Sequence, residues 1–182
     1  MRTLPQSRPD LAGTLDSIRR MLRVLRRSAG QSERQLGIGS AQLFVLQQLA
    51  DRPAASVNEL AARTYTDQSS VSVVVRRLAA QGLVSRRRAP DDGRRRELSL
   101  TAAGRRLVAR APVPAQVRLI EGLGSLRRTE LTALRRLLGK VVREMGAAHE
   151  PPSMFFSESG RIGRSREPNV KRVLARDGDV SP

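Results

Sequence analysis

Two groups of residues near the middle of the chain combine side-chain types that bind polyanions. The first group places short polar side chains ahead of two cations: Gln68, Ser69, Ser70, Ser72, Arg76 and Arg77. The second group surrounds an Asp-Gly pair with guanidinium groups: Arg86, Arg88, Asp92, Arg94, Arg95 and Arg96. Glutamine forms paired hydrogen bonds with adenine, serine hydroxyls donate to phosphates or bases, and arginine suits a narrow minor groove. Together the two groups predict a surface that binds double-stranded DNA.

Each group also has a simpler interpretation. Polar side chains are ordinary on any exposed helix, and an arginine-rich hairpin can be a solvated charged loop. Val73 lies among the polar residues, where it either contacts a thymine methyl group or packs inward. Asp92 precedes Arg94 by two positions, so its carboxylate can brace that guanidinium or the amides of the turn. Arginines around one hairpin repel one another, which favours an anionic partner.

The residues around the first group predict two short helices joined by a turn. Ser56 and Glu59 have the spacing of a capping box, which begins a helix that runs through Arg63. Residues 64–66 supply the turn, and Asp67 caps the helix that follows. The apolar face of this second helix, which we expect to pack inward, is formed by Val71, Val74 or Val75, and Leu78.

The residues around the second group predict a β-hairpin. Gly82 suits the position just after a helix, and residues 83–87 alternate like a strand. Asp92-Gly93 predicts the turn, and residues 97–100 predict the returning strand. The apolar face of that strand is formed by Leu98 and Leu100.

Two helices are expected before this central segment. Residues 10–34 carry an apolar stripe at helical spacing, interrupted by arginines. A further helix begins with Ser40 as its N-cap and ends before Pro53. The apolar stripe of the first helix is formed by Leu11, Leu15, Ile18, Leu22 and Leu25.

Three helical segments are expected after the hairpin. Thr101 caps a helix that Pro112 and Pro114 interrupt. The helical pattern resumes over residues 115–123 and again over 126–145. The last helix has a near-heptad apolar stripe, which is more typical of a core or dimer face than of a ligand site. That stripe is formed by Leu131, Leu134, Leu138, Val141 and Met145.

Charge and composition narrow the class of protein. The net charge of +17 is typical of a polyanion binder. Only Lys140 and Lys171 are lysines, so the arginine excess can also reflect the codon usage of a genome. The chain has no cysteine, which excludes disulfides, thiolate metal sites and thiol-based oxidation sensing. His149 is the one histidine and has no neighbouring metal ligand, so we expect no metal.

The sequence lacks the patterns of enzymes and of membrane proteins. It contains no paired carboxylates, no Ser-His-Asp set and no phosphate-binding loop, so we expect no catalytic residues and no cofactor. No apolar run approaches the about 20 residues that cross a bilayer, and the N-terminus lacks the core of a signal peptide. We therefore expect a cytoplasmic protein.

Over residues 10–146, and most strongly from Ser56 to Gly104, the sequence resembles the MarR family of bacterial transcriptional regulators. Three motifs in this order carry the resemblance. They are Leu78-Ala-Ala-Gln-Gly82-Leu83-Val84, then Asp92-Gly-Arg94, then Leu100-Thr101-Ala-Ala-Gly104.

The resemblance implies a mainly α fold in which a winged helix-turn-helix lobe carries a two-stranded β wing. It implies a DNA-binding lobe at about residues 40–104 and dimerisation helices at about 10–36 and 105–146. The ends, 1–9 and 147–182, are expected to be disordered.

The resemblance also implies how the chain contacts DNA and a partner. The helix over residues 67–81 would read the major groove, and Arg94 would enter the minor groove with Asp92 stabilising the wing. The first and last helices would intertwine with those of a second subunit.

By this resemblance the chain is a homodimeric, sequence-specific regulator, a repressor that binds a pseudo-palindromic operator and is released by a small, often phenolic, ligand. The residues themselves do not separate repression from activation. Phe44 and Tyr65 are the aromatic residues that would wall a ligand pocket.

Two departures from the family pattern accompany the resemblance. Pro112 and Pro114 break a helix that is usually long in the family, and Val73 replaces a residue that is often polar or basic. Two other functions remain open. One is a non-specific basic nucleic-acid-binding or structural protein, although the shortage of aromatics argues against binding single strands. The other is a winged helix that binds a protein partner instead of DNA.

Overall fold

The computed structural model describes residues 9–54, 56–89, 92–150 and 154–155. These residues form helices and one two-stranded antiparallel sheet. In chain order the elements are α1 (Pro9–Leu36), α2 (Ser40–Asp51), α3 (Val57–Thr64), α4 (Gln68–Ala80), β1 (Val84–Ala89), β2 (Asp92–Leu100), α5 (Ala102–Ala109), α6 (Ala115–Gly124) and α7 (Arg128–Glu144).

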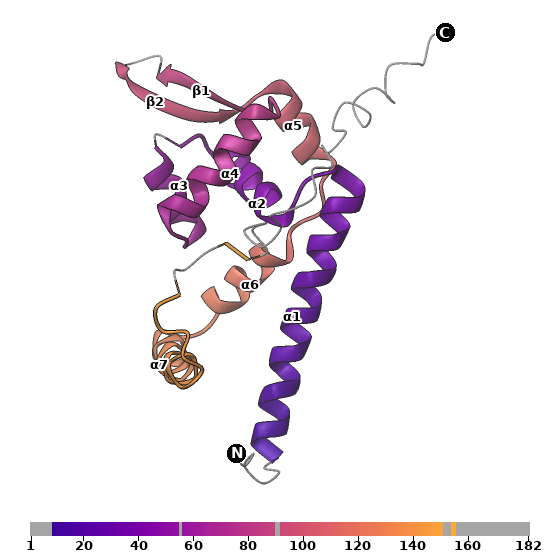
Figure 1. The fold of residues 1–182 in the computed structure, drawn as a ribbon, viewed down its shortest axis with the longest axis vertical. Helices are drawn as coiled ribbons and strands as arrows, with labels where there is room; N and C mark the ends of the chain where they lie inside the picture. The colour runs from indigo at the N-terminus through magenta and orange to yellow at the C-terminus, as the bar shows by residue number, and fades with distance from the viewer. Residues whose placement is uncertain (1–8, 55, 90–91, 151–153, 156–182) are drawn as a thin grey trace.

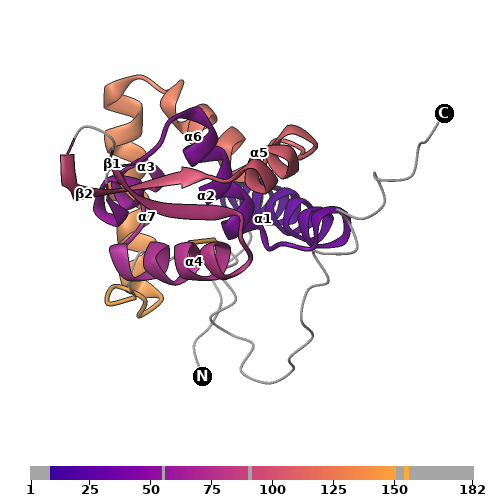
Figure 2. The same ribbon diagram turned by 90° about the horizontal axis from the view of Figure 1, so that it is seen from above.

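The winged helix-turn-helix fold expected from the sequence is confirmed. Helices α2 to α5 and the base of the β1–β2 hairpin surround one apolar core, and the hairpin projects from it as a wing (Figures 1 and 2). Helix α1 extends from this lobe as a long arm, with its N-terminal end far from the wing (Figure 1). Helices α6 and α7 continue the chain on the same side of the lobe as the arm.

Helix α1 is attached to the lobe mainly through its last turns. Its buried residues are Leu25, Ser32 and Leu36, and the hydroxyl of Ser32 donates to the carbonyl of Ile38 at 2.9 Å. The rest of the helix is exposed on most sides. The apolar stripe of an amphipathic helix is normally buried, so we expect another surface to cover this one. No helix in the described part of the chain has the length and apolarity needed to cross a membrane.

Helix α2 is the central helix of the lobe. Phe44 and Val45 have no exposed surface, because the helix is surrounded by α1, α3, α4, α5 and β2. The expected cap was wrong by one position. Gly39 is the N-cap, its amide donating to the Gln42 side chain at 3.1 Å, and Ser40 is the first helical residue. The Ser40 hydroxyl is instead buried without a hydrogen-bond partner.

The predicted break at the two prolines is confirmed. Helix α5 ends at Ala109 and α6 begins at Ala115, with Pro114 at its N-cap. The interrupted segment is held by two hydrogen bonds that cross the fold. The Gln47 amide donates to the Pro112 carbonyl at 3.3 Å, and the Ala115 amide donates to the Ser28 hydroxyl at 3.1 Å.

One residue of the C-terminal segment completes the core. Met154 is only 3% exposed and belongs to the apolar core, although it falls within the 147–182 region for which the sequence predicts disorder. The run of three apolar residues from Met154 to Phe156 is too short to show a helical or strand period, so the sequence could not reveal this contact. Residues 1–8 and 156–182 lie outside the described part of the structure.

Candidate nucleic-acid interface

The turn between α3 and α4 fixes the orientation of the predicted DNA-reading helix. Ser56 caps α3 by accepting the Glu59 amide at 3.1 Å, as predicted. Tyr65 then adopts a left-handed conformation, with φ of 53°, and the Thr66 amide returns to the Ala61 carbonyl at 3.1 Å. The buried Thr64 hydroxyl lies 2.7 Å from that of Thr66. The turn is therefore short, and these hydrogen bonds hold it against the end of α3.

Asp67 caps α4, as the sequence predicts. Its carboxylate accepts the Ser70 amide at 2.8 Å and also a hydrogen bond from the Ser69 hydroxyl. The hydrogen bond from Ser69 and those from Ser70 lower the pKa of Asp67 from 3.8 to about 2. An anionic cap also interacts favourably with the positive end of the helix dipole. The first turn of α4 is thus held by a carboxylate that stays ionised in any physiological buffer.

The two faces of α4 separate as the pattern predicts. Val71, Val74, Val75 and Leu78 are buried against the core. Ser69, Val73 and Arg76 recur at helical spacing on the opposite face, and all are exposed. Gln68 and Arg77 are also exposed, whereas Ser70 and Ser72 are half-buried.

Val73 is the residue that sequence reasoning left open. Its side chain is 44% exposed and lies at the centre of the outward face, between Ser69 and Arg76. The interpretation that it packs inward is therefore wrong. An exposed branched aliphatic side chain at this position is suited to contact with a thymine methyl group.

The base of the wing is joined to the lobe by backbone hydrogen bonds. Strands β1 and β2 pair antiparallel, with Val84 opposite Leu100 and Ser85 opposite Ser99. Leu98, inward-facing as predicted, exchanges backbone hydrogen bonds with Ala54 at 3.0 and 2.7 Å. Because Ala54 immediately precedes the α3 region, this bridge couples the position of the wing to the helix-turn-helix.

The pairing of β1 with β2 shows where the arginines of the wing lie along the two strands. Arg86 lies on β1 and is exposed, and Arg88 pairs with Arg96 across the hairpin. The predicted turn at Asp92-Gly93 was wrong, because Asp92 pairs with Ala89 and both Asp92 and Gly93 belong to β2. A register shift between Arg88 and Ala89 causes the displacement. The side chains of residues 87–96, which include Arg88, Asp92, Arg94, Arg95 and Arg96, lie outside the described part of the structure.

The Leu100–Gly104 motif that follows the wing holds the start of α5 against the residues that lead into β1. The Thr101 hydroxyl accepts the Gly104 amide at 3.1 Å, capping α5 as predicted, and donates to the Gly82 carbonyl at 2.7 Å. A Cβ at Gly104 would lie 2.2 Å from the Leu83 carbonyl oxygen. Glycine at this position therefore lets α5 approach the start of β1, so the Leu-Thr-x-x-Gly pattern sets where the wing leaves the lobe.

Two residues near the interface were not identified from the sequence. The Arg63 guanidinium donates to the carbonyls of Arg52 at 2.8 Å and Pro53 at 2.6 Å, and it pairs with Glu59. It therefore joins the end of α2 to α3. Tyr65 is 75% exposed in the turn before α4, close enough in sequence to Asp67 to lie beside the N-terminus of the reading helix. Neither residue has a sequence motif that would single it out.

Phe44 and Tyr65, the aromatic residues that could wall a ligand pocket, do not lie together in the described part of the structure. Phe44 is buried in the core and Tyr65 is on the surface, because α2 is the central helix and Tyr65 lies in a turn. A cavity of about 10 Å³ does lie where α1, α2 and α6 meet, close to the size of one water molecule. Its lining residues are Leu25, Ser28, Ser40, Pro114, Ala115, Gln116 and Phe155.

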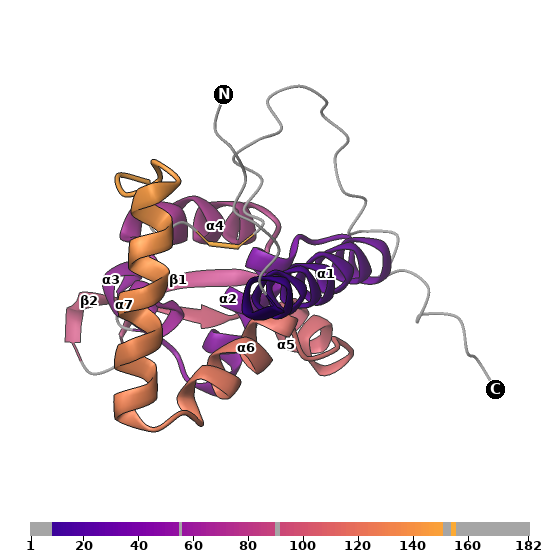
Figure 3. The ribbon, with the colours of Figure 1, turned by 90° about the horizontal axis from the view of Figure 1, so that it is seen from below.

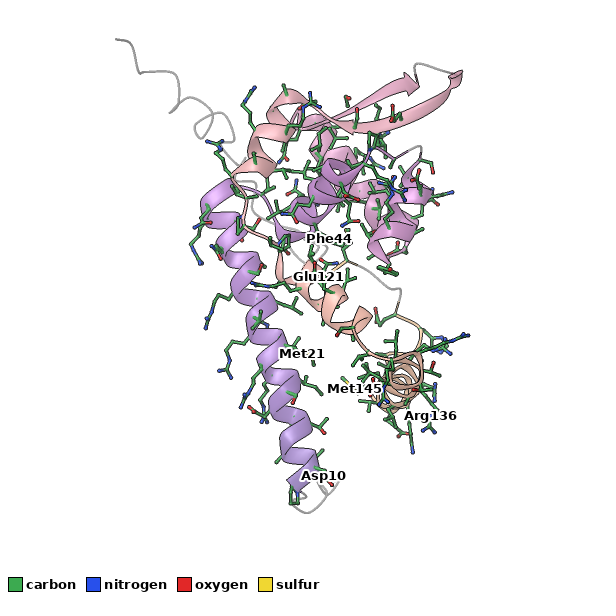
Figure 4. All side chains as sticks on the ribbon, turned by 180° about the vertical axis from the view of Figure 1, so that it is seen from behind. Asp10, Met21, Phe44, Glu121, Arg136 and Met145 are labelled. Atoms are coloured by element: carbon green, nitrogen blue, oxygen red, sulfur yellow. The ribbon has the colours of Figure 1, made fainter. Side chains whose placement is uncertain are left out.

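The arm and the last helix present apolar side chains to solvent. Helix α7 has no buried residue, and Met145 at its end is 75% exposed. Met21 on α1 and Met145 project into the region between the two helices, whereas Arg136 points away from it (Figure 4). Figure 3 shows α7 crossing below the lobe as a separate rod. The exposed apolar residues of the two helices include Leu11, Leu15, Met21, Leu22, Val24, Leu131, Leu137, Leu138, Val141, Val142 and Met145.

Comparison with known proteins agrees with this architecture. A sequence model of the MarR family matches residues 36–95, the segment from the end of α1 into the wing. Sco3205, a MarR family transcriptional regulator from Streptomyces coelicolor solved in complex with DNA, is 21% identical, with a TM-score of 0.51 over 81% of this chain and 98% of that one.

A second solved structure is similar to the same degree. The MarR/EmrR family transcriptional regulator from Acinetobacter sp. ADP1 is 21% identical, with a TM-score of 0.51 over 77% of this chain and 99% of that one. At this identity the two likenesses establish the fold. No curated protein matches the sequence.

Proposed function

Because residues 36–95 carry the MarR family segment, we propose that this chain is a homodimeric transcriptional regulator that binds a pseudo-palindromic operator. Helix α4 lies in the major groove and the wing enters the neighbouring minor groove. The observation that carries the proposal is the outward face of α4, where Ser69, Val73 and Arg76 are exposed beside a wing that is fastened to the same lobe. Sco3205, whose fold this chain shares, was solved in complex with DNA.

The residue roles follow from the two surfaces. Gln68, Ser69 and Ser72 face base edges and phosphates, Val73 contacts a thymine methyl, and Arg76 and Arg77 hold the backbone. In the wing, Arg94 enters the minor groove, braced by Asp92, while Arg86, Arg88, Arg95 and Arg96 contact flanking phosphates. The pairing of Arg88 with Arg96 supports this role, since like charges directly across a hairpin are unfavourable without counter-anions.

The dimer is proposed from the exposed apolar faces. A helix without a buried residue gains little by standing alone, and contiguous apolar surface usually marks an interface. We assign the lobe to about residues 40–104 and dimerisation to about 10–36 and 105–146. Two-fold symmetry then gives two lobes for two operator half-sites.

Regulation is proposed at the junction of α1, α2 and α6. The chain acts as a repressor, and a small ligand that enters this junction changes the spacing of the two lobes. The cavity of about 10 Å³ is too small for an aromatic ligand, so binding requires Phe155 to move. Release of DNA by such a ligand is thus coupled to the C-terminal segment.

The test is a selection of duplexes from a random pool by the full chain. Enrichment of one inverted repeat, protected as a discrete footprint, is the expected result. Arg94→Ala should weaken binding to the selected duplex by about 1–3 kcal/mol, whereas Arg136→Ala, on the outer side of α7 (Figure 4), should leave affinity unchanged. A pool that stays random after several rounds would contradict the regulator and favour charge-driven nucleic-acid binding.

A further inference from the structure

A second cationic surface lies on α1, outside the helix-turn-helix and the wing. Between Asp16 and Arg34 the helix carries six arginines and only two acidic residues. Arg20 pairs with Asp16 at 2.6 Å. Four others, which we call the α1 arginine face, share one side of the helix by their spacing. They are Arg19, Arg23, Arg26 and Arg27.

Within the part of the chain that the structure describes, these four guanidinium groups have no protein partner. All four residues are exposed, and within the described residues none forms a hydrogen bond or an ion pair. Like charges three and four positions apart destabilise a helix, so the cluster is unfavourable unless an anion binds it. Together with Leu22 the four side chains surround an open groove of about 510 Å³ on the helix surface.

The α1 arginine face points away from the rest of the protein. Leu25 and Leu36, on the other side of α1, pack on the lobe. Met21 projects toward α7, and nitrogen-tipped side chains project from α1 on the opposite side (Figure 4). The apolar side of the helix therefore faces the lobe and α7, and Leu22 is the apolar residue that lies beside the four arginines.

The chemistry of this face fits the backbone of a nucleic acid duplex. Arginine binds phosphate through two parallel hydrogen bonds, which lysine cannot do. From Arg19 to Arg27 the helix rises by about 12 Å. Duplex DNA carries one charge per about 1.7 Å of axis with both strands counted, so a duplex of this length contains about seven phosphates, some of which lie on the side that the helix faces.

The α1 arginine face and the wing are too far apart to serve the same stretch of straight DNA. Figure 1 places the wing at one end of the molecule and the N-terminal half of α1 at the other. Met21 marks the level of the arginine face in Figure 4, well below the wing. We propose that the α1 arginine face binds the phosphate backbone of a second DNA segment, without sequence preference, while the lobes hold the operator.

The test separates this surface from the lobes. In the full chain, Arg86, Arg88, Arg94, Arg95 and Arg96 are all changed to Ala, which removes the wing cations assigned above to DNA contact. Binding of this variant to a mixed-sequence 24-base-pair duplex is followed by fluorescence anisotropy over a salt series. Because no operator is used and the wing is disabled, the result does not depend on whether the proposed regulator function is correct.

The expected result is specific to α1. Changing Arg19, Arg23, Arg26 and Arg27 to Gln in this background should weaken binding at least tenfold and lower the salt slope by about 3.6, since each of the four phosphate contacts contributes about 0.9. The matched control removes the same charge from the outer side of α7, by changing Arg128, Arg135, Arg136 and Arg143 to Gln. It should weaken binding less than twofold. Glutamine keeps helix propensity, and circular dichroism checks that both variants stay folded.

Three outcomes would overturn the proposal. Equal loss in the α1 and α7 variants would mean that only total charge matters. Unchanged binding in the α1 variant would mean that the face does not contact DNA. Binding to phosphatidylserine vesicles that needs the α1 arginines, without binding to the duplex, would assign the face to a membrane surface.

Discussion

The stability of α4 depends on the ionisation of one carboxylate, that of its N-cap residue Asp67. The folded pKa of about 2 lies below the ordinary 3.8, so the group stabilises the fold above pH 4 and loses this contribution as the pH falls toward 2. Asp67→Asn keeps a capping side chain but removes the charge. We expect the variant to be less stable than wild type at pH 7 by about 0.3–1 kcal/mol.

The sign of this effect is testable by thermal unfolding at a series of pH values. The difference in melting temperature between wild type and Asp67→Asn should shrink between pH 4 and pH 2. A difference that stays constant over this range would assign the stabilisation to the shape of the cap and not to its charge.

Tyr65 combines a left-handed backbone with an exposed ring. Non-glycine residues in this region cost about 1 kcal/mol, and strain of this kind is found where a side chain has a function. We expect Tyr65→Asn to keep or slightly raise the melting temperature, because asparagine tolerates this conformation. Affinity for the selected operator should fall about fivefold, the loss of one phosphate hydrogen bond.

This variant separates stability from binding. Operator titration at fixed salt and calorimetry are made on the same preparation. If the variant loses stability while keeping affinity, Tyr65 has a structural role and does not contact DNA.

Gly104 sets the packing between elements. A methyl group there would lie 2.2 Å from the Leu83 carbonyl oxygen, and backbone cannot move as a side chain can. We expect Gly104→Ala to lower the free energy of unfolding by about 2 kcal/mol through overpacking. Chemical denaturation measures this change in the free energy of unfolding.

Gly122 provides the matched control. It lies in α6, where a methyl group would meet no atom within 4 Å beyond the backbone of its own helix. Gly122→Ala should therefore raise stability by about 0.5–1 kcal/mol through helix propensity. Loss of stability in both variants would indicate that helix geometry, and not the contact with Leu83, limits substitution.

The elements that the sequence predicted well are those whose signals are local. The cap at Asp67, the inward valines of α4, the Thr101 cap and the break at Pro112 and Pro114 each depend on a few neighbouring residues. The failures depend on distant contacts. The burial of Met154 follows from packing around α2, which no local pattern reports. The N-cap at Gly39 instead of Ser40 is an exception, since the Gln42 side chain that accepts its amide is only three residues away.

Local signals also predicted which side of α4 is exposed, whereas features of the candidate site that depend on packing and strand pairing were missed. The polar face of α4 follows from its period, whereas the exposure of Val73 depends on how the whole helix is rotated against the core. The wing turn was misplaced because strand register is set by pairing across the hairpin, and the register shift between Arg88 and Ala89 has no signal in the sequence of either strand.

At the scale of the whole molecule, the exposed face of α7 predicts the oligomeric state. Val141→Glu places a charge on the apolar face and should convert the proposed dimer to monomer at micromolar concentration, since burying an unpaired charge is costly. Sedimentation velocity measures the change. Arg136→Glu, on the opposite side of the same helix (Figure 4), should leave the dimer intact.

A monomeric wild type at these concentrations would contradict the proposed assembly. Dissociation by both substitutions would instead show that α7 is sensitive to charge on any side, so that its apolar face is not the specific contact.

The lobe joins the rest of the chain through two non-helical connections, Gly37–Gly39 on one side and the proline segment around Pro112–Pro114 on the other. Among the described residues, Ser32 donates to Ile38 at the first connection and Gln47 donates to Pro112 at the second. In the proposed dimer, rotation about these two connections would move each lobe without unwinding a helix. A regulator built in this way should tolerate operators whose half-sites differ in separation by a base pair, and one protein could then serve a set of promoters with unequal architecture.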